Sequence, residues 1–330
     1  GDHRDLHLSL RRQRQMCIRD RYYVNDVPHI GHAYTTVICD TIANFNKWLG
    51  NEVNFLTGTD EHGQKVEKSA LKANMDPQTF TDNVSTSFKK LASKLEITNT
   101  DFIRTTEDRH IKSVKHLWNI LVNKGDIYIG KYSGWYSIRD EAFYSNDEII
   151  EDKNGKKLAP NGSEVEWLEE PSYFFKLSSW QDKLLKFYEK NPDFISPKSR
   201  YNEVLSFVNG GLEDLSISRT TFNWGIQVPD NDDHVIYVWL DALTNYISAL
   251  DYPNKDSKNW KSFWPADIHV VGKDILRFHA IYWPAFLMAA ELEVPKKIYA
   301  HGWWTVDGKK MSKSTGNVVS PDIILSLIHI

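Results

Sequence analysis

Short apolar runs that end in polar residues and lead into helices occur on both sides of a long aromatic-rich segment. Residues 52–56 form one such run, and a helical pattern follows it at 64–74. Residues 267–271 form another, which leads into a helical pattern that continues to Ala290, and the run 297–300 follows. Strand–helix units of this kind build a parallel sheet with helices on both faces. The pattern therefore predicts an α/β fold, a doubly wound parallel sheet that is split by an insertion.

Helical periodicity and turn signals divide the rest of the chain. Apolar residues at helical spacing predict a helix over 31–49, which Gly50 ends. Residues 126–180 instead place aromatic side chains among turn sequences, which predicts a β-rich insertion. The apolar run 234–240 is typical of a buried parallel strand. Further helical patterns are present at 64–74, 77–94 and 108–124.

Composition narrows the class of protein. The 330 residues include two cysteines, Cys17 and Cys39, which excludes a disulfide framework and a zinc site built from cysteines. The longest apolar run, Ile281–Ala290, is about half of the ~20 residues that span a bilayer. The charged N-terminal residues do not resemble a signal peptide. We therefore expect a cytoplasmic, globular protein without a membrane segment.

The formal net charge of −4 is unevenly distributed. Residues 1–21 hold six Arg and three Asp, a net charge of +3, so the remaining residues carry −7. A negative body argues against general binding of nucleic acid. Any nucleic acid that binds must therefore meet local basic patches.

Residues 1–21 differ in character from the sequence that follows. They show neither strand nor helix periodicity. Central parallel strands are near-continuous apolar runs, whereas this segment contains Arg14, Arg19, Asp20 and Arg21, which are costly to bury unpaired. We expect residues 1–21 to be foreign or disordered, or to pair only through the backbone with the arginines directed outward.

The C-terminal residues begin a helix and then stop. Ser320 is a suitable N-cap, and Pro321 suits the first helical position. We expect residues 325–330 to be foreign as well, and the polypeptide as written to be a partial, weakly active form.

Two short motifs carry phosphate-binding chemistry. His29 and His32 flank Gly31 at a predicted helix start, where free backbone N–H groups favour an anion. Alone, such a pair is more often two surface histidines. Lys310 and Lys313 lie in the sequence KMSKS, which fits either a solvated basic loop or a mobile loop whose lysines meet a polyphosphate. The two motifs in this order are far more specific than either one alone.

The pair HIGH and KMSKS resembles the class I aminoacyl-tRNA synthetases, and the sequence between them resembles the methionyl-tRNA synthetase family. The resemblance covers about residues 22–324. It is strongest to zinc-less bacterial and mitochondrial-like members, because the segment 134–149 has no cysteine. The stretches that carry it are YYVNDVPHIGHAYTT (22–36), FLTGTDEHGQK (55–65), LSISRTTFNWGI (215–226), YVWLDALTNYI (237–247), VGKDILRFHAIYWPA (271–285) and AHGWWTVDGKKMSKSTGNVVSP (300–321).

The resemblance implies a methionine site and an ATP site. Asp60 would meet the methionine ammonium, although an Asp at this point can also be a helix N-cap. Trp239 and Tyr246 would form an aromatic box for the thioether, and the alternative for the pocket residues is core packing. Lys313 would be the firmer of the two loop contacts to ATP. The methionine set is Tyr23, Asp60, Trp239, Ala242, Leu243, Tyr246, Ile275 and His279; the ATP set is His29, Gly31, His32, Lys273, Lys310 and Lys313, of which His29, His32, Lys310 and Lys313 would be catalytic.

The implied reaction has two steps. L-methionine and ATP form methionyl-adenylate, and the acyl group then passes to tRNA(Met). Positioning and charge stabilisation would carry the catalysis, so no enzyme nucleophile or general base is needed. ATP and Mg²⁺ are implied and zinc is not, whereas the oligomeric state is not predicted.

The resemblance also implies a division of the chain and two departures from the family. Arg21 stands where the family has an apolar residue whose carbonyl faces the amino group of methionine, and the helical anticodon-binding domain is absent. The expected parts are the N-terminal segment 1–21, the first half of a Rossmann-like catalytic domain at 22–118, a β-rich zinc-less connective insertion at 119–228, the second half of the catalytic domain at 229–306, and the KMSKS loop with a shortened C-terminus at 307–330.

Three alternatives stay open at this point. The first is another class I synthetase, although the insertion is too short for the editing domain of the branched-chain enzymes and the thiolate zinc site of the cysteine enzyme is missing. The second is a small-molecule nucleotidyltransferase with the same His-x-Gly-His helix start. The third is a fragment of the methionine family without activity.

Overall fold

The computed structural model describes residues 14–24, 27–139, 142–144, 146, 148–152, 155–303, 305–306, 309–310 and 319–327. Within these residues the central sheet has seven strands: β1 (Arg14–Arg19), β2 (Tyr22–Tyr23), β3 (Glu52–Asp60), β4 (Asp101–Arg104), β10 (Ile195–Ser196), β15 (Ile268–Gly272) and β16 (Ile298–His301). Their order is β10-β16-β15-β1-β3-β2, with β4 beside β3, and every pairing is parallel. The predicted α/β fold with a parallel sheet is confirmed.

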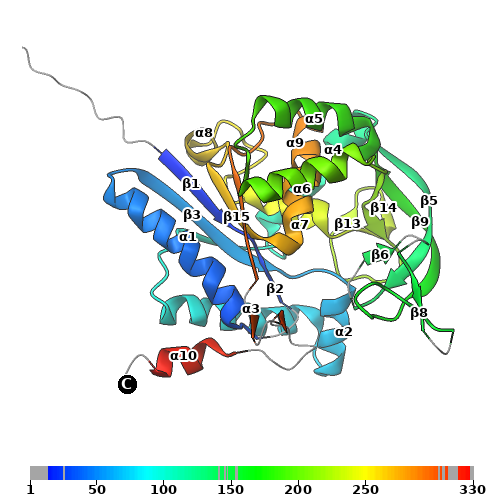
Figure 1. Ribbon diagram of the computed structural model, residues 1–330, viewed down its shortest axis with the longest axis horizontal. Helices are drawn as coiled ribbons and strands as arrows, with labels where there is room; N and C mark the ends of the chain where they lie inside the picture. Colours follow the sequence, from blue (N-terminus) through cyan, green and yellow to red (C-terminus); the bar gives the residue numbers. More distant parts are fainter. Residues whose placement is uncertain are drawn as a thin grey trace, which may run out of the picture.

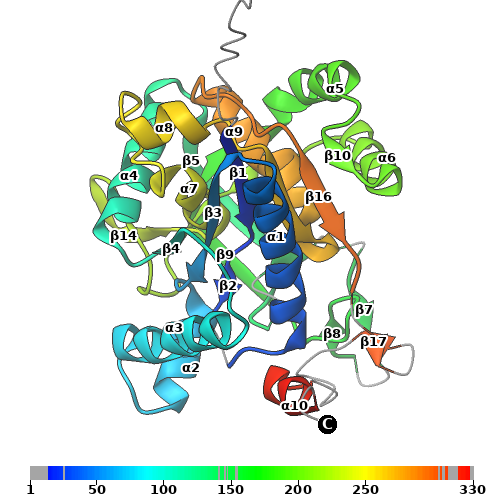
Figure 2. The ribbon, with the colours of Figure 1, turned by 90° about the vertical axis from the view of Figure 1, so that its left-hand side faces the viewer.

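Helices cover both faces of this sheet. Figures 1 and 2 show α1 (Ile30–Trp48) on one face and α4 (Asp108–Asn123), α7 (Trp239–Ser248) and α9 (Trp283–Ala289) on the other. The helices predicted at 31–49, 64–74, 77–94 and 108–124 are confirmed within one or two residues. The remaining helices are α2 (Gln64–Lys72), α3 (Pro77–Lys94), α5 (Gln181–Lys190), α6 (Lys198–Asn209), α8 (Lys258–Phe263) and α10 (Pro321–Leu327), with a 3₁₀ turn η1 (Leu177–Trp180).

The expectation that residues 1–21 do not form a buried strand is wrong for residues 14–19. These residues form β1 at the centre of the sheet, between β15 and β3. Met16 and Ile18 pack in the core beneath α4 and α7, whereas Cys17 packs with Cys39 of α1 on the opposite face. Met16, Cys17 and Ile18 therefore fill the core on both faces of the sheet at the middle of β1.

The charges of this segment lie at the two ends of the strand. Arg14 is exposed at the start of β1 and pairs with Glu52 at 3.1 Å. The prediction that the arginines point outward is wrong for Arg19 and Arg21, which are 3% and 6% exposed. The Arg19 guanidinium lies 3.4 Å from the centre of the Tyr22 ring, and Arg21 Nε donates to Asn245 Oδ1. Contact with an aromatic ring and an amide partly replaces the water that these groups lose.

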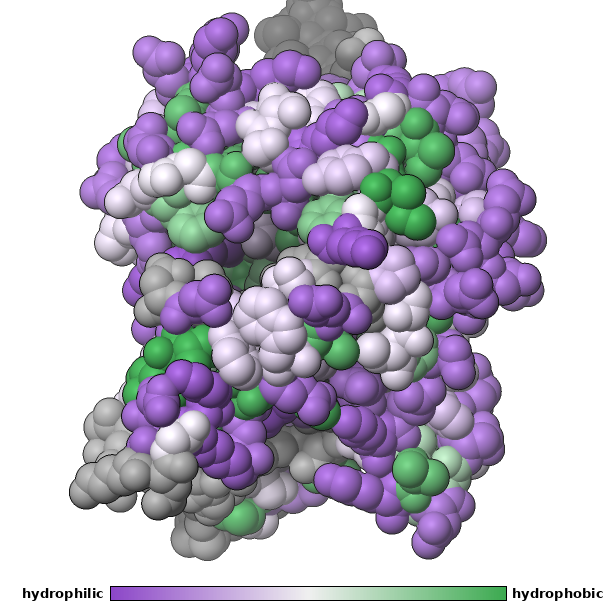
Figure 3. Space-filling model, turned by 90° about the vertical axis from the view of Figure 1, so that its right-hand side faces the viewer, coloured by the Kyte–Doolittle hydropathy of each residue, from purple (hydrophilic) through white to green (hydrophobic). Residues whose placement is uncertain are grey.

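The insertion is built around a long antiparallel ribbon. Strands β5 (Ile127–Ser137) and β9 (Glu166–Phe175) pair along their whole length, and β6 (Ala142–Tyr144) and β11 (Leu215–Ser216) complete a four-stranded sheet. On the face of the molecule with this ribbon, apolar side chains form small separate patches among hydrophilic ones (Figure 3). The domain boundaries expected from the sequence remain predictions.

Two further pairs of short strands are antiparallel. They are β7 (Ile150–Glu151) with β8 (Lys157–Leu158), and β17 (Thr305–Val306) with β18 (Lys309–Lys310).

The buried parallel strand predicted at 234–240 is wrong. Strand β14 (Asn231–Ile236) is antiparallel between β12 (Ser218–Arg219) and β13 (Gln227–Val228), and α7 begins at Trp239. The apolar run therefore spans a strand end and a helix start, which periodicity cannot separate in a short buried segment.

The helix predicted from Gly272 to Ala290 is also interrupted. It consists of a 3₁₀ turn η2 (Lys273–Ile275), a π-helical turn η3 (Phe278–Tyr282) and α9. Among the helices that the structure describes, none is long and apolar enough to cross a membrane.

Candidate active site

A cleft of about 1340 Å³ opens at the carboxyl ends of the central strands. Its lining includes Asp20 after β1, Asp60 at the end of β3 and Lys273 after β15. Ligands of open parallel sheets bind at this edge. The predicted residues that line the cleft are Tyr23, Asp60, Trp239, Ala242, Leu243, Tyr246, Lys273 and Ile275.

One face of α7 supplies the apolar wall of the cleft. Trp239, Ala242, Leu243 and Tyr246 recur at i, i+3, i+4 and i+7, so they share a helix face. The Trp239 ring stacks on Phe278 of the π-helical turn, with the ring centres 3.5 Å apart. This stack fixes the Trp239 ring by a contact from a second element.

The pairing of β2 with β3 brings the carboxylate of the site to the cleft. Tyr23 lies opposite Asp60 in the ladder, and the Asp60 carbonyl accepts from the backbone N–H of Val24 at 3.2 Å. β1 and β2 pair with β3 in registers that differ by one residue. Ile18 lies opposite Leu56 and Tyr22 lies opposite Thr59, so the chain between β1 and β2 has one residue more than the facing stretch of β3. Tyr23 and Asp60 are thus placed side by side by the backbone.

His279 lies behind the cleft wall and not in it. It is fully buried, its Nε2 lies 2.6 Å from the Tyr246 hydroxyl, and its Nδ1 lies 2.9 Å from the carbonyl oxygen of Ile275. The Tyr246 hydroxyl also donates to Asp20 Oδ1 at 3.0 Å. His279 therefore orients Tyr246, which itself lines the cleft.

Burial and hydrogen bonding act in opposite directions on Asp20. Burial favours its neutral form, but the hydrogen bond and charge of His279 outweigh this and lower the pKa of Asp20. Burial, followed by the charge of Asp20, raises the pKa of Tyr246. Asp20 is therefore an anion and Tyr246 a neutral donor at neutral pH.

Arg21 brings a cation to the same wall. Its guanidinium carbon lies 5.0 Å from the centre of the Tyr246 ring, and burial lowers the pKa of Arg21 to about 10. In the described part of the chain, neither terminal nitrogen of Arg21 has a hydrogen-bond partner. The position that departs from the family therefore carries a poorly compensated charge beside the predicted methionine pocket.

The two histidines of the HIGH sequence cap α1. His29 is the N-cap residue, and its Nδ1 accepts from the backbone N–H of Gly31 at 3.1 Å. His32 Nδ1 accepts from the backbone N–H of His29 at 3.1 Å, and the two rings stack with centres 3.8 Å apart. Since both Nδ1 atoms accept, each neutral ring carries its proton on Nε2. Among the described residues, His29, Gly31 and His32 are not part of the cleft lining.

Of the three lysines of the predicted ATP site, only Lys273 is seen to line the cleft in the part of the chain that the structure describes. Lys273 lines the cleft, and its Nζ lies 3.4 Å from the centre of the Trp303 ring. The backbone of Lys310 pairs with Thr305 in the β17–β18 hairpin. Lys313 lies outside the described residues.

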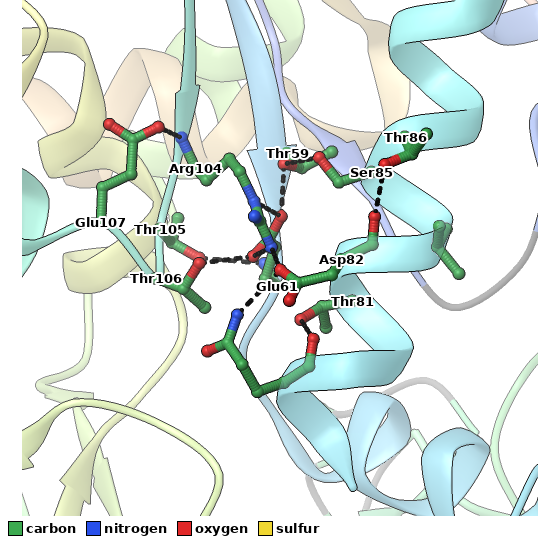
Figure 4. Close-up of polar contacts among 12 residues, drawn as sticks. Thr59, Glu61, Thr81, Asp82, Ser85, Thr86, Arg104, Thr105, Thr106 and Glu107 are labelled. Carbon is green, nitrogen blue, oxygen red and sulfur yellow. Dashed lines mark hydrogen bonds and ion pairs between the residues drawn. The ribbon is translucent and has the colours of Figure 1, made fainter. Parts of the chain in front are cut away.

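Glu61, next to Asp60, forms a buried network that the sequence analysis missed. Its side chain is inaccessible to solvent and accepts from Arg104 Nε at 2.7 Å and Nη2 at 2.9 Å (Figure 4). Thr106 and Thr59 donate to the same carboxylate at 2.7 and 2.6 Å. Burial opposes the charge of Arg104, but its bonds to Glu61 and Asp82 outweigh this and raise its pKa.

A second buried group was also missed. Asp241 on α7 lies between His62 Nδ1 and His110 Nε2, with both nitrogen–oxygen distances 2.6 Å. Burial disfavours the charge of Asp241, but the two histidines outweigh this and lower its pKa to about 2. Burial lowers the pKa of His110 despite its bond to Asp241. An ionised Asp241 thus accepts a hydrogen bond from each ring.

A local signal for both groups exists in the sequence. Asp60, Glu61 and His62 follow directly one after another at the end of a predicted strand, where side chains at a sheet edge meet ligands. Arg104, which pairs with Glu61, and Asp241, which pairs with His62, are distant from this segment in the sequence. The same holds for His110, the second partner of Asp241, so the sequence alone could not predict these pairings. Among the residues that the structure describes, no group of three or more His, Cys, Asp or Glu side chains could hold a metal ion.

Comparison with known proteins finds a matching family and close relatives. A family model described as tRNA synthetases class I (M) matches residues 20–330. The methionine--tRNA ligase of Rickettsia bellii is 65% identical over 300 residues, which cover 91% of this chain and 58% of the relative. That of Brucella suis is 52% identical over 310 residues, which cover 92% and 60%.

The structure is also similar to solved structures. The crystal structure of Mycobacterium tuberculosis methionyl-tRNA synthetase bound by methionyl-adenylate matches with a TM-score of 0.92 at 48% identity, over 96% of this chain and 62% of that one. The apo form of the Mycobacterium tuberculosis protein matches with a TM-score of 0.77 at 46% identity, over 88% of this chain and 56% of that one. The chain thus spans about three fifths of the length of its similar relatives.

Proposed function

The chain belongs to the class I tRNA synthetases (M), and from that premise we propose that its cleft activates L-methionine with ATP. The product is methionyl-adenylate, whose acyl group then passes to tRNA(Met). One observation carries the proposal: the cleft brings the carboxylate of Asp60 and the aromatic side chains of Trp239 and Tyr246 into one lining. Methionine has a matching pair of groups, an ammonium and a polarizable thioether.

The relatives favour methionine over the other class I substrates. The similar curated proteins are methionine--tRNA ligases, and the similar solved structure binds methionyl-adenylate. A sister synthetase or a small-molecule nucleotidyltransferase has no comparable support. Tyr23, Ala242, Leu243 and Ile275 complete the proposed methionine pocket.

In the first step an oxygen of the methionine carboxylate attacks the α-phosphorus of ATP. A phosphorus–oxygen bond forms to the carboxylate, and the bond from the α-phosphorus to the oxygen that bridges to the β-phosphate breaks, so pyrophosphate leaves. We assign the Nε2 protons of His29 and His32, the helix start at Gly31 and the cations Lys273, Lys310 and Lys313 to the phosphates. No protein nucleophile takes part.

Mg²⁺ would enter with ATP and neutralise charge on its phosphates. It keeps much of its water and binds readily to phosphate oxygens, so it needs no cage of protein ligands. We propose no zinc site. We propose tRNA(Met) as the macromolecular partner and the cytoplasm, where tRNA is consumed, as the location.

The test is amino-acid-dependent exchange of pyrophosphate into ATP with the full chain. Methionine should support exchange, whereas leucine, isoleucine, valine and cysteine should not. Exchange with one of these other amino acids alone would identify a sister synthetase. No exchange with any amino acid would show that the polypeptide is an inactive fragment.

The Asp60 variant tests the proposed ammonium contact. Asp60→Ala should lose about 1.5–3 kcal/mol or more of methionine-dependent transition-state stabilisation, because a charge-assisted bond is removed. The fold should stay nearly intact, since the backbone of Asp60 still pairs in the sheet. Asp256→Ala removes a surface carboxylate paired with Lys261 and is the matched control. Near-normal exchange by Asp60→Ala would refute the assignment.

A further inference from the structure

Helix α7 has two functional faces. Trp239, Ala242, Leu243 and Tyr246 line the cleft. Asp241 and Ser248 are seven residues apart and therefore lie together on another face of the helix. Both contact His110 of α4, through distances of 2.6 Å from Asp241 and 3.2 Å from Ser248. The face of α7 away from the cleft therefore makes polar contacts with α4.

Asp241 also connects α7 to the segment that carries Asp60. Its second oxygen lies 2.6 Å from His62 Nδ1, and His62 is two residues beyond Asp60. The backbone around His62 is held as well, because the Trp224 indole donates to the Glu61 carbonyl at 2.5 Å and the Gly63 N–H donates to the Trp224 carbonyl at 3.0 Å. A displacement of α7 would therefore be transmitted to this segment.

Glu61 holds the same segment from the other side. The bidentate pair with Arg104 of β4 and the bonds from Thr59 and Thr106 leave the Glu61 carboxylate little freedom (Figure 4). Asp60 therefore lies between two anchored neighbours, one bound to β4 and one bound to α7. Its position relative to the apolar wall depends on the α7 anchor.

We propose that Asp241 is a positioning residue that sets the length of the amino-acid pocket. By holding His62 and His110 together it fixes the distance between Asp60, which would bind the ammonium, and the α7 side chains, which would bind the thioether. This inference rests on the proposed function. Its consequence is side-chain selectivity: the pocket should distinguish methionine from a shorter straight-chain amino acid through the spacing that Asp241 maintains.

The buried group formed by Asp241, His62 and His110 is better explained by the geometry that it imposes than by any stability that it adds. A charge and two imidazoles are costly to bury, and an apolar replacement of such a group is often neutral or stabilising. Hydrogen bonds of 2.6 Å, in contrast, have strict distance and angle requirements. A trio with these properties holds three elements, α4, α7 and the end of β3, in one arrangement.

The experiment measures kcat and KM for methionine, ATP and norvaline in the exchange assay. Asp241→Asn should raise the methionine KM by about tenfold or more, because small misplacements within a site are expensive. The ATP KM should change by less than about twofold, and the preference for methionine over norvaline should fall. Ser248→Ala removes the outer contact of His110 and a bond within α7 to the Thr244 carbonyl, and it should behave like the wild type.

A second pair of variants keeps the test decisive if Asp241→Asn folds poorly. His62→Asn places an amide nitrogen near the site of Nδ1 and should retain selectivity, whereas His62→Ala should lose it. An active wild type with unchanged methionine KM and selectivity in Asp241→Asn and His62→Ala would overturn this inference alone. A wild type without methionine-dependent exchange would overturn the proposed function, and this inference with it.

Discussion

At the scale of single residues, Arg21 shows how a charge is accommodated at the end of a central strand. The strand interior is apolar, and Arg21 lies just beyond it against Asn245 and the Tyr246 ring. These contacts satisfy one nitrogen of the guanidinium but not the two terminal nitrogens. A buried cation with incomplete hydrogen bonding costs free energy that an apolar side chain would not.

Arg21→Leu should therefore stabilise the protein by about 1–3 kcal/mol. Because burial lowers the pKa of Arg21 in the folded protein to about 10, below its ordinary value, the unfolded chain holds this proton more firmly. The penalty is present at neutral pH and is relieved as the pH rises through 10, so the gain from the variant should shrink there. Urea unfolding at pH 7 and pH 10.5 measures both effects.

The control is Arg14→Leu, since Arg14 is exposed at the opposite end of β1 and pairs with Glu52 at the surface. Its free energy of unfolding should change by less than about 0.5 kcal/mol. A loss of stability in Arg21→Leu would show that Asn245 and Tyr246 compensate the charge fully.

At the scale of elements, the start of α1 combines a structural and a chemical task. Ser, Thr, Asp and Asn are the common N-caps, but here two histidines close a capping box. Each ring accepts through Nδ1, which directs the remaining proton to Nε2. Capping therefore sets the tautomer that a phosphate ligand would require.

Two variants of His29 separate these tasks. His29→Ala removes the cap and should cost about 1 kcal/mol of stability. His29→Asn restores a good cap but has no Nε2 proton, so it should keep the melting temperature of the wild type. Both variants should lose exchange activity. If His29→Asn were fully active, capping alone would explain the residue.

At the scale of the whole molecule, Asp241 joins parts of the chain that are far apart in sequence. It lies 131 positions from His110 and 179 from His62, so the contacts exist only in the folded state. The free energy of these hydrogen bonds therefore contributes to global folding and depends on the ionisation of Asp241.

The stability difference between the wild type and Asp241→Asn should depend on pH. The pKa of Asp241 falls from 3.8 to about 2 on folding, so its contribution is fully present above pH 3.8 and is lost as the pH falls towards 2. The contribution is on the order of 2 kcal/mol. Chemical unfolding between pH 7 and pH 3 should show a constant difference above pH 5 and a smaller one below pH 4. A difference that grows in acid would contradict this assignment.

Local patterns were sufficient for most elements. The spacing of apolar residues located α1, α2, α3 and α4, and the short apolar runs located β3, β15 and β16. Local patterns failed where the conformation of a segment depended on the residues packed against it. The run 234–240 changes from an antiparallel strand to a helix at Trp239, and residues 14–19 fill a central strand position despite their flanking charges. In both places the packing partners, and not the local propensity, decided the conformation.

Periodicity and short motifs were enough to predict the fold class, the family and the chemical types of several cleft residues, because each is read from residues close together in the chain. Only the tertiary structure showed that His279 lies behind Tyr246 and that Asp241 connects His62 to His110. These are contacts between positions distant along the chain. They form when the sheet and its helices pack together, so no local pattern of the sequence encodes them.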